Sequence, residues 1–156
     1  MAKTLVKTKG KYKSQTGCPI EYGLSTFGDK WSLIIVRDIM FKGKKYYGDF
    51  ACCEEGISTN ILASRLAELE ENGILNKDRD PENKTKFIYS LTEKGKDLLP
   101  IMAEMVRWAN NYDPETTADR HLIEELEQDR EAFIEKMRGL IGQNIFNEDG
   151  ECSVED

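Results

Sequence analysis

Residues 46–91 read YYGDFACCEEGISTNILASRLAELEENGILNKDRDPENKTKFIYSL, and their pattern decides the fold. The segment 46–54 is long enough for a short helix of two turns, and Gly56 interrupts it. Ser58 is a typical N-cap residue and predicts a second helix over Thr59–Glu71. One side of this helix carries apolar residues at the i, i+4, i+7 spacing of a buried stripe, at Leu62, Leu66 and Leu69.

A β-hairpin is predicted directly after the second helix. Residues 74–77 are expected to form a short strand, and residues 78–83 are dense in turn formers. Over 85–91 apolar and polar residues alternate, as in a strand with one buried face. The order of short helix, turn, helix and hairpin is that of a winged helix-turn-helix, in which the hairpin is the wing.

Helices are predicted on both sides of this stretch. Asp29 is a suitable N-cap for a mostly apolar helix over Lys30–Met40. Thr92 is predicted to cap a long helix that reaches residues 110–112, with a kink or a late restart at Pro100.

The expected fold class is therefore mainly α with a small β-hairpin, a winged helix-turn-helix. A basic arm is predicted over residues 1–16, the winged-helix domain over 17–112, an acidic helical extension over 113–146 and a disordered tail over 147–156. Asp113 and Pro114 match the cap and first residue of a helix, so the extension is expected to begin as a helix there.

Charge is distributed unevenly along the 156 residues. The net charge is −7, yet residues 1–50 carry ten basic and four acidic side chains, and residues 101–156 carry five and fifteen. A basic front of this kind permits an anionic partner. No apolar run is long enough for a membrane span or a signal peptide, so the expected location is the cytoplasm, with no membrane partner.

The second helix suits the major groove of double-stranded DNA. Opposite its leucine stripe stand Asn60 and Ser64, flanked by Thr59, whereas the acids come late in the helix. Small side chains permit close approach, and Asn is able to bond bidentately to adenine. Arg65 stands on the flank, within reach of a phosphate oxygen.

Phosphate contacts are predicted at two basic clusters. Lys42, Lys44 and Lys45 precede the short helix with no acid until Asp49. The hairpin tip carries basic residues beside an equal number of acids, so a merely solvated turn is the alternative there; the basic residues are Arg79, Lys84 and Lys86.

The long helix after the hairpin is apolar over more of its surface than one small domain needs. This width predicts burial against a second chain. The residues assigned to that dimer interface are Leu98, Met102, Met105, Val106 and Trp108.

The chain resembles the HxlR-type transcriptional regulators, winged-helix relatives of the MarR group. The resemblance runs over roughly residues 17–110 and is carried by an ordered set of short motifs. These are Cys18-Pro19, Gly28-Asp29-Lys30-Trp31, Gly56-Ile57-Ser58, Arg65-Leu66, Gly73-Ile74-Leu75, Tyr89-Ser90-Leu91-Thr92-Glu93-Lys94-Gly95, Leu99-Pro100 and Trp108-Ala109. The family usually has Arg-Phe where this chain has Lys45-Tyr46, and the acidic segment 113–156 extends beyond the usual family length.

The resemblance implies a homodimer that binds a palindromic operator, with an interface built from the N-terminal segment and the C-terminal helices. It places DNA-contacting residues at Ser58, Thr59, Asn60, Ser64 and Arg65. The alternative is a winged-helix protein-interaction module that does not bind DNA. No enzyme, metal site or cofactor is expected, and the small-molecule effector and the operator are unknown.

Four cysteines raise the question of a redox switch. In a cytoplasmic chain they are expected to be free thiols. The resemblance implies that Cys18 of the Cys-Pro pair senses oxidants or electrophiles; Cys52 or Cys53 would then be a partner for Cys18 of the second chain. The alternatives are an inert Cys18 and a core-filling role for Cys52 and Cys53.

Overall fold

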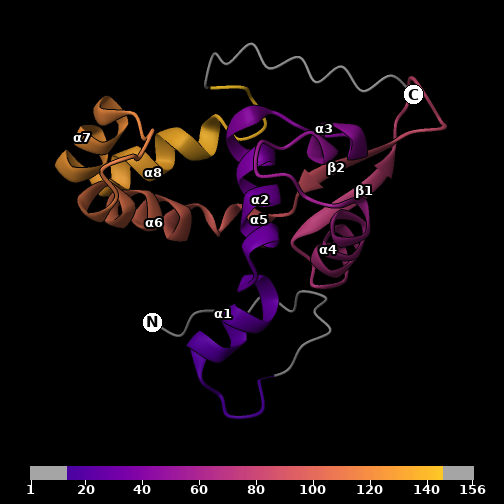
Figure 1. The fold of residues 1–156 in the computed structure, drawn as a ribbon, viewed down its shortest axis with the longest axis horizontal. Coiled ribbons are helices and arrows are strands. Elements are labelled where there is room, and N and C mark those ends of the chain that lie inside the picture. Colours follow the sequence, from indigo (N-terminus) through magenta and orange to yellow (C-terminus); the bar gives the residue numbers. More distant parts are fainter. Residues whose placement is uncertain (1–13, 146–156) are drawn as a thin grey trace.

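The computed structural model describes residues 14–145, and α2 stands at the centre of this region (Figure 1). On one side lie the two helices α3 and α4 and the hairpin; on the other lie α6, α7 and α8, while α1 projects from one end (Figure 1). The elements are α1 (Pro19–Phe27), α2 (Lys30–Lys42), α3 (Tyr47–Ala51), α4 (Thr59–Glu71), β1 (Leu75–Arg79), β2 (Phe87–Leu91), α5 (Glu93–Lys96), α6 (Leu99–Tyr112), α7 (Arg120–Gln128) and α8 (Arg130–Gly139). Most of the predicted arm and all of the predicted tail 147–156 lie outside the described residues.

The central helix α2 begins after its predicted cap, Asp29, and runs two residues past the predicted end at Met40. Oδ1 of Asp29 accepts hydrogen bonds from the backbone N–H groups of Trp31 and Ser32, both 3.0 Å long. The helix ends at Gly43, which has a φ of 63°, a left-handed conformation that favours glycine. Residues on several sides of α2 are buried, because the molecule surrounds it; they include Ile35, Val36, Ile39 and Met40.

The two helices of the helix-turn-helix differ in how closely they match the prediction. The first, α3, covers only Tyr47–Ala51, and Oδ2 of Asp49 accepts a 2.9 Å hydrogen bond from the N–H of Tyr46. The second, α4, covers the predicted Thr59–Glu71, with Ser58 as its N-cap. Its leucine stripe is buried as predicted, at Leu62, Leu66 and Leu69.

The wing is a two-stranded antiparallel sheet. Its register pairs Leu75 with Leu91 and Arg79 with Phe87. Leu75, Tyr89 and Leu91 are buried against the core, whereas the rest of β1 is exposed. The strand pair therefore extends outward from the core as a ribbon, which Figure 1 shows.

The segment after the wing restarts at the proline, as predicted. Oγ1 of Thr92 accepts a 3.0 Å hydrogen bond from the N–H of Gly95 and caps the short helix α5. The longer α6 then begins at Leu99, with Pro100 in its first turn, where no N–H is needed.

The start of the first helix in the acidic extension was predicted wrongly. Asp113 ends α6, and its Oδ1 accepts a hydrogen bond from the N–H of Glu115, which closes a turn. The next helix, α7, begins only after Asp119, which caps it. Asp129 ends α7 and also caps α8, since its Oδ1 accepts a hydrogen bond from the N–H of Ala132. This side-chain hydrogen bond competes with a continuous helix, so α7 and α8 are separate.

The extension folds back on the rest of the chain. Helices α7 and α8 pack on each other and on α6. The side chain of Arg138 bonds Glu93 and Asp97 at 2.8 and 2.9 Å and so joins α8 to α5. The chain then returns to the end of α2, where the N–H of Ile145 donates to the carbonyl of Phe41.

Two residues predicted for the dimer interface belong to the core of the same chain. Leu98 is 5% exposed and Met102 is 8% exposed. Because α6 is apolar on two sides, one side covers the core and the other faces outward. Within residues 14–145, no helix is long and apolar enough to cross a membrane.

Candidate nucleic-acid interface

The N-terminal half of α4 presents an exposed surface free of acids. Ser58, Thr59, Asn60 and Ser64 are all exposed, and the first turn of the helix carries no acidic residue. The hydroxyl of Tyr47 donates a 3.0 Å hydrogen bond to the carbonyl of Thr59, so α3 holds the start of α4 in place. The geometry is that of a recognition helix whose N-terminal residues face outward.

Arg65, predicted as a phosphate contact, is engaged within the chain. It forms an ion pair with Glu68 one turn further along α4. Its Nε lies 3.7 Å from Oδ1 of Asp29, the N-cap residue of α2. The guanidinium therefore joins α4 to α2, and this role was not evident from the sequence.

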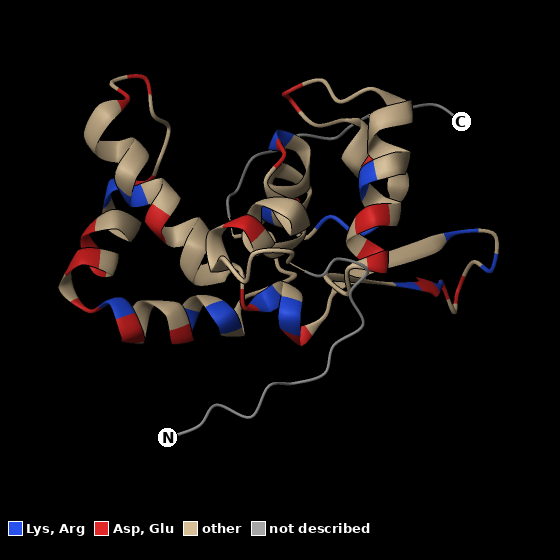
Figure 2. Ribbon diagram, turned by 90° about the horizontal axis from the view of Figure 1, so that it is seen from below, with Lys and Arg blue, Asp and Glu red and all other residues tan. Residues whose placement is uncertain are grey.

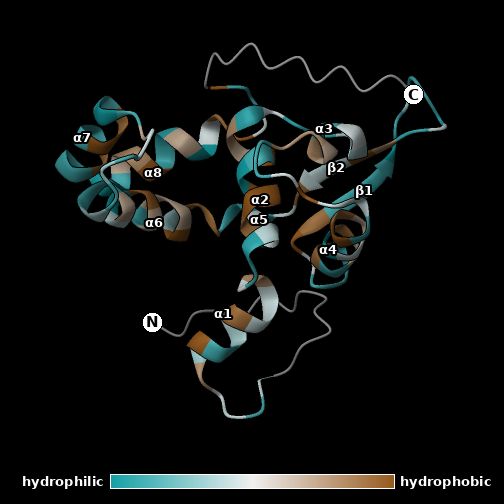
Figure 3. Cartoon of the chain, in the orientation of Figure 1, coloured by the Kyte–Doolittle hydropathy of each residue, from teal (hydrophilic) through white to brown (hydrophobic). Residues whose placement is uncertain are grey.

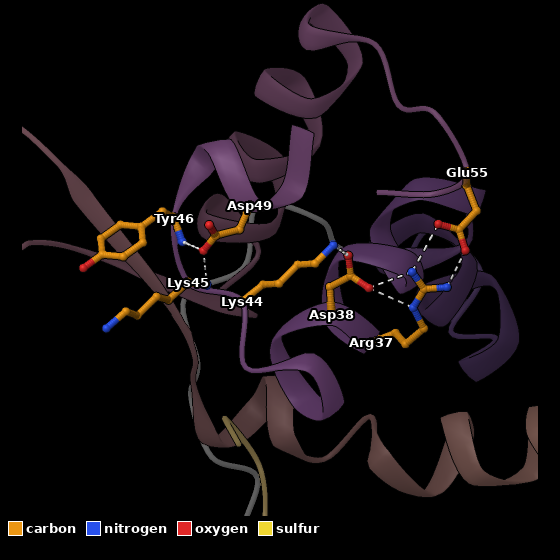
Figure 4. Close-up of polar contacts among 7 residues, drawn as sticks. All are labelled: Arg37, Asp38, Lys44, Lys45, Tyr46, Asp49 and Glu55. Carbon is orange, nitrogen blue, oxygen red and sulfur yellow. Dashed lines mark hydrogen bonds and ion pairs between the residues drawn. The ribbon is translucent and has the colours of Figure 1, made fainter. Parts of the chain in front are cut away.

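The three lysines before α3 separate into different roles. Nζ of Lys44 lies 2.8 Å from Oδ2 of Asp38, whose side chain is 1% exposed. Figure 4 shows Lys44 directed at this carboxylate and Lys45 pointing the other way, beside Tyr46. Lys45 is exposed, whereas Lys42 is half-buried at the end of α2. Of the three, Lys45 is the residue best placed to meet an external anion.

Lys44 belongs to a chain of ion pairs that includes the turn of the helix-turn-helix. Arg37 bonds Asp38 and also Glu55, which lies between α3 and α4 (Figure 4). The hydrogen bond from Arg37 lowers the pKa of Glu55 to about 2. The network joins α2 to the turn through charges that are partly buried, and the Asp38 carboxylate at its centre is fully buried.

A single aromatic ring brings the wing and the lysines together. The hydroxyl of Tyr46 donates a 2.7 Å hydrogen bond to Oδ2 of Asp80, a buried carboxylate at the start of the wing tip. This bond lowers the pKa of Asp80 and raises that of Tyr46. Nζ of Lys45 and Nζ of Lys86 lie 5.1 and 5.7 Å from the centre of the Tyr46 ring. Two exposed cations from different elements therefore meet beside α3.

The rest of the wing carries cations along its strands. Arg79 donates a 2.7 Å hydrogen bond to the carbonyl of Lys84, and its guanidinium lies 4.7 Å from the ring of Phe87. Lys77, which we did not predict, lies over the same ring at 4.6 Å. The alternation along β1 could have revealed it, because Lys77 and Arg79 share a face. In Figure 2 basic segments mark both strands near the tip, with acidic residues between them.

The cysteines occupy different environments. Cys18 is exposed and is the N-cap residue of α1, whereas Cys53 is buried in the core. The prediction of free thiols holds for these two and is wrong for Cys52, which is disulfide-bonded. Cys152 lies outside the described residues.

Two helices present large apolar side chains to the outside. On α1, Ile20 is 69% exposed and Leu24 is 63% exposed; on α6, Trp108 is 65% exposed. Met105 and Tyr112 continue the outer side of α6, and the rings of Trp108 and Tyr112 lie 5.3 Å apart. Figure 3 shows the hydrophobic segments of α1 on a helix that stands away from the rest of the chain. Exposed apolar area of this kind marks an interaction surface.

The fold and this surface define a winged helix-turn-helix protein of the transcription-regulator class. The family model of HxlR-like helix-turn-helix proteins matches residues 12–117, and the chain belongs to this family. Its relatives are regulators rather than enzymes. The HTH-type transcriptional regulators YybR and YodB of Bacillus subtilis are 35% and 37% identical to it. The alignments cover 66% and 62% of this chain, and 82% and 87% of YybR and YodB.

Solved structures show the same fold. The reduced form of YodB from B. subtilis superposes with a TM-score of 0.53 at 36% identity, covering 64% of this chain and 97% of that one. The redox regulator HypR in its oxidised form has a TM-score of 0.54 at 35% identity, covering 60% and 96%. The predicted family and fold class are confirmed, and the protein is a transcriptional regulator of the helix-turn-helix type.

Proposed function

We propose that the protein binds a palindromic operator as a homodimer and inserts α4 into the major groove. The observation that carries this proposal is the exposed, acid-free N-terminal half of α4 beside the cations that meet at Tyr46. Asn60, Thr59 and Ser64 are the base-reading residues. Small or amide-bearing side chains at these positions suit close approach to base edges.

Phosphate contacts come from the exposed cations beside Tyr46 and along the wing. Lys45 and Lys86 form one group beside Tyr46, and Arg79 and Lys84 extend it along the wing. Lys44 and Arg65 act inside the chain, as counter-ions of Asp38 and of Asp29 and Glu68. The contacts position the protein on DNA without reading its sequence.

The dimer forms through α1 and the outer side of α6. Each protomer offers the apolar surface that such an interface needs, with Ile20 and Leu24 on α1 and Met105 and Trp108 on α6. Val106, also predicted for the interface, is 41% exposed on a different side of α6. A symmetric dimer would present its two α4 helices about 34 Å apart, one turn of DNA.

Cys18 is the cysteine best placed to act as a switch. It is exposed, and it begins α1, which contributes to the proposed interface. Oxidation there would alter the arrangement of the two protomers and with it the spacing of the α4 helices. Cys53 is too buried for a first reaction with an oxidant.

The test is a fluorescence-anisotropy titration of DNA from the region upstream of the gene, at fixed salt. Reduced protein, diamide-treated protein and the Cys18→Ser variant are compared. If oxidation abolishes tight DNA binding by the wild type but not by the variant, the result supports both operator binding and the switch at Cys18. Tight binding that oxidation does not change supports operator binding and contradicts the cysteine switch. If the protein binds no duplex in either state, the result supports the protein-interaction alternative.

A further inference from the structure

A cavity of about 380 Å³ opens between α2, α6, α7 and α8. Its walls are mostly apolar and come from side chains that belong to the core or pack against it. They include Phe41 from α2, Leu99 and Met102 from α6, Leu126 from α7, and Phe133 and Met137 from α8. Apolar side chains that line a cavity open to the surface remain in contact with water, so the cavity requires an explanation.

The cavity depends on the acidic extension. Residues 12–117 match the HxlR-like family, whereas α7 and α8 lie beyond that match. Leu126 and Met137 are 4% and 3% exposed, so the extension is firmly packed where it forms the wall. The extension therefore forms one wall of a cavity beside the shared winged-helix domain. The volume of this cavity lies within the range of binding sites for small organic molecules.

The mouth of the cavity is polar and carries charges of both signs. Arg37 and Lys42 contribute the basic groups, and Glu54, Glu55 and Asp119 the acidic ones. Arg37 and Glu55 neutralise each other, and Lys42, Glu54 and Asp119 leave a net charge of only −1, so the mouth does not favour a strongly charged ligand. The hydroxyls of two loop residues, Thr116 and Thr117, provide hydrogen-bonding groups beside the apolar interior.

We propose that this cavity binds an uncharged, mainly apolar organic molecule of one or two rings with a polar substituent at the mouth. The position links such a ligand to the helix-turn-helix, because Glu54 and Glu55 lie in the turn between α3 and α4. A bound molecule would touch Arg37 and Glu55, the residues that join α2 to this turn. Only this link to DNA binding rests on the proposed function; ligand binding itself does not.

The experiment uses N-phenylnaphthylamine, an uncharged two-ring dye whose emission rises in apolar sites, with the full chain and no DNA. Val106 lines the cavity and is 41% exposed, so Val106→Trp fills the mouth without entering the core. Thr117→Trp fills it from the exposed loop and serves if the first variant folds poorly. Gln128→Trp is the matched control, since it adds the same side chain at an exposed position outside the cavity.

The wild type and Gln128→Trp are expected to bind one dye per chain with equal, saturable affinity. Val106→Trp and Thr117→Trp are expected to weaken binding about tenfold or more. The proposal is overturned if the wild type shows no saturable binding, or if both mouth variants bind the dye as the control does. Because DNA is absent, a failure here is distinct from a failure of operator binding.

Discussion

The hydroxyl of Tyr46 donates a 2.7 Å hydrogen bond to Oδ2 of Asp80, and this bond joins the start of α3 to the tip of the wing. The two residues are 34 positions apart in the chain. The same ring lies beside the ammonium groups of Lys45 and Lys86. Tyr46 therefore holds together the part of the surface that we propose meets phosphate.

Tyr46→Phe is expected to lower the free energy of unfolding by about 1–2 kcal/mol, because buried Asp80 loses a donor. The ring, and with it the two lysine contacts, is retained. Tyr47→Phe is the control: its hydroxyl also bonds, to the carbonyl of Thr59, but from an exposed position where water replaces it. Urea denaturation measures both variants, and equal losses would contradict the special role of Tyr46.

Asn60→Ala is expected to relax sequence preference at one or two base pairs, at a cost of about 1–3 kcal/mol on the best operator. The reason is the loss of a bidentate amide on the exposed face of α4. A binding-site selection with wild type and variant measures the preference. Identical selected sequences would remove Asn60 from the base-reading set.

Adjacent lysines are expected to give opposite phenotypes. Lys45→Ala should weaken binding to all duplexes alike and reduce the slope of log affinity against log salt by about 1, with stability within about 0.5 kcal/mol of wild type. Lys44→Ala should instead destabilise the fold by about 1–3 kcal/mol, because Asp38 is buried and, within residues 14–145, retains only Arg37 as an ion-pair partner.

Salt-dependent anisotropy and urea denaturation together separate these two lysines. If Lys44→Ala reduced the salt slope and Lys45→Ala lowered the stability, Lys44 would be the DNA contact and its ion pair with Asp38 would be dispensable.

The ion pair of Glu55 predicts an acid-sensitive part of the stability. Arg37 lowers the pKa of Glu55 from 4.5 to about 2. A carboxylate whose pKa is lower in the folded state stabilises fully above pH 4.5, and this stabilisation is lost as the pH falls toward 2. Its size is at most about 3 kcal/mol, and screening reduces it because the pair is partly exposed.

Glu55→Gln should therefore be less stable than wild type at neutral pH, and the difference should shrink toward pH 2. Glu54→Gln is the control, since exposed Glu54 has no ion pair among the described residues. Denaturant midpoints at a series of pH values measure the effect. A difference that stays constant over the whole series would exclude Glu55 as its source.

The recognition helix was predictable because its signals are local. Ser58 before the helix, the leucine stripe within it and Asn72-Gly73 after it fix α4 without reference to other elements. Once Leu62 and Leu66 are buried, helix geometry alone exposes the residues on the opposite side. These exposed residues include Asn60 and Ser64, as predicted.

The errors arose where tertiary contacts decide between equal local signals. Asp113-Pro114 and Asp119 both suit a helix start, and packing of Ile123 and Leu126 against the rest of the chain favours the second. The internal ion pairs of Lys44 and Arg65 could not be predicted, because Asp38 and Asp29 reach them only in the folded chain.

The central claim is operator recognition by a two-fold symmetric dimer, and hydroxyl-radical footprinting of the selected operator tests it most directly. The account predicts two equivalent protected half-sites, related by a two-fold axis and centred about one DNA turn apart. A single unsymmetrical footprint, or uniform protection that does not depend on sequence, would contradict it.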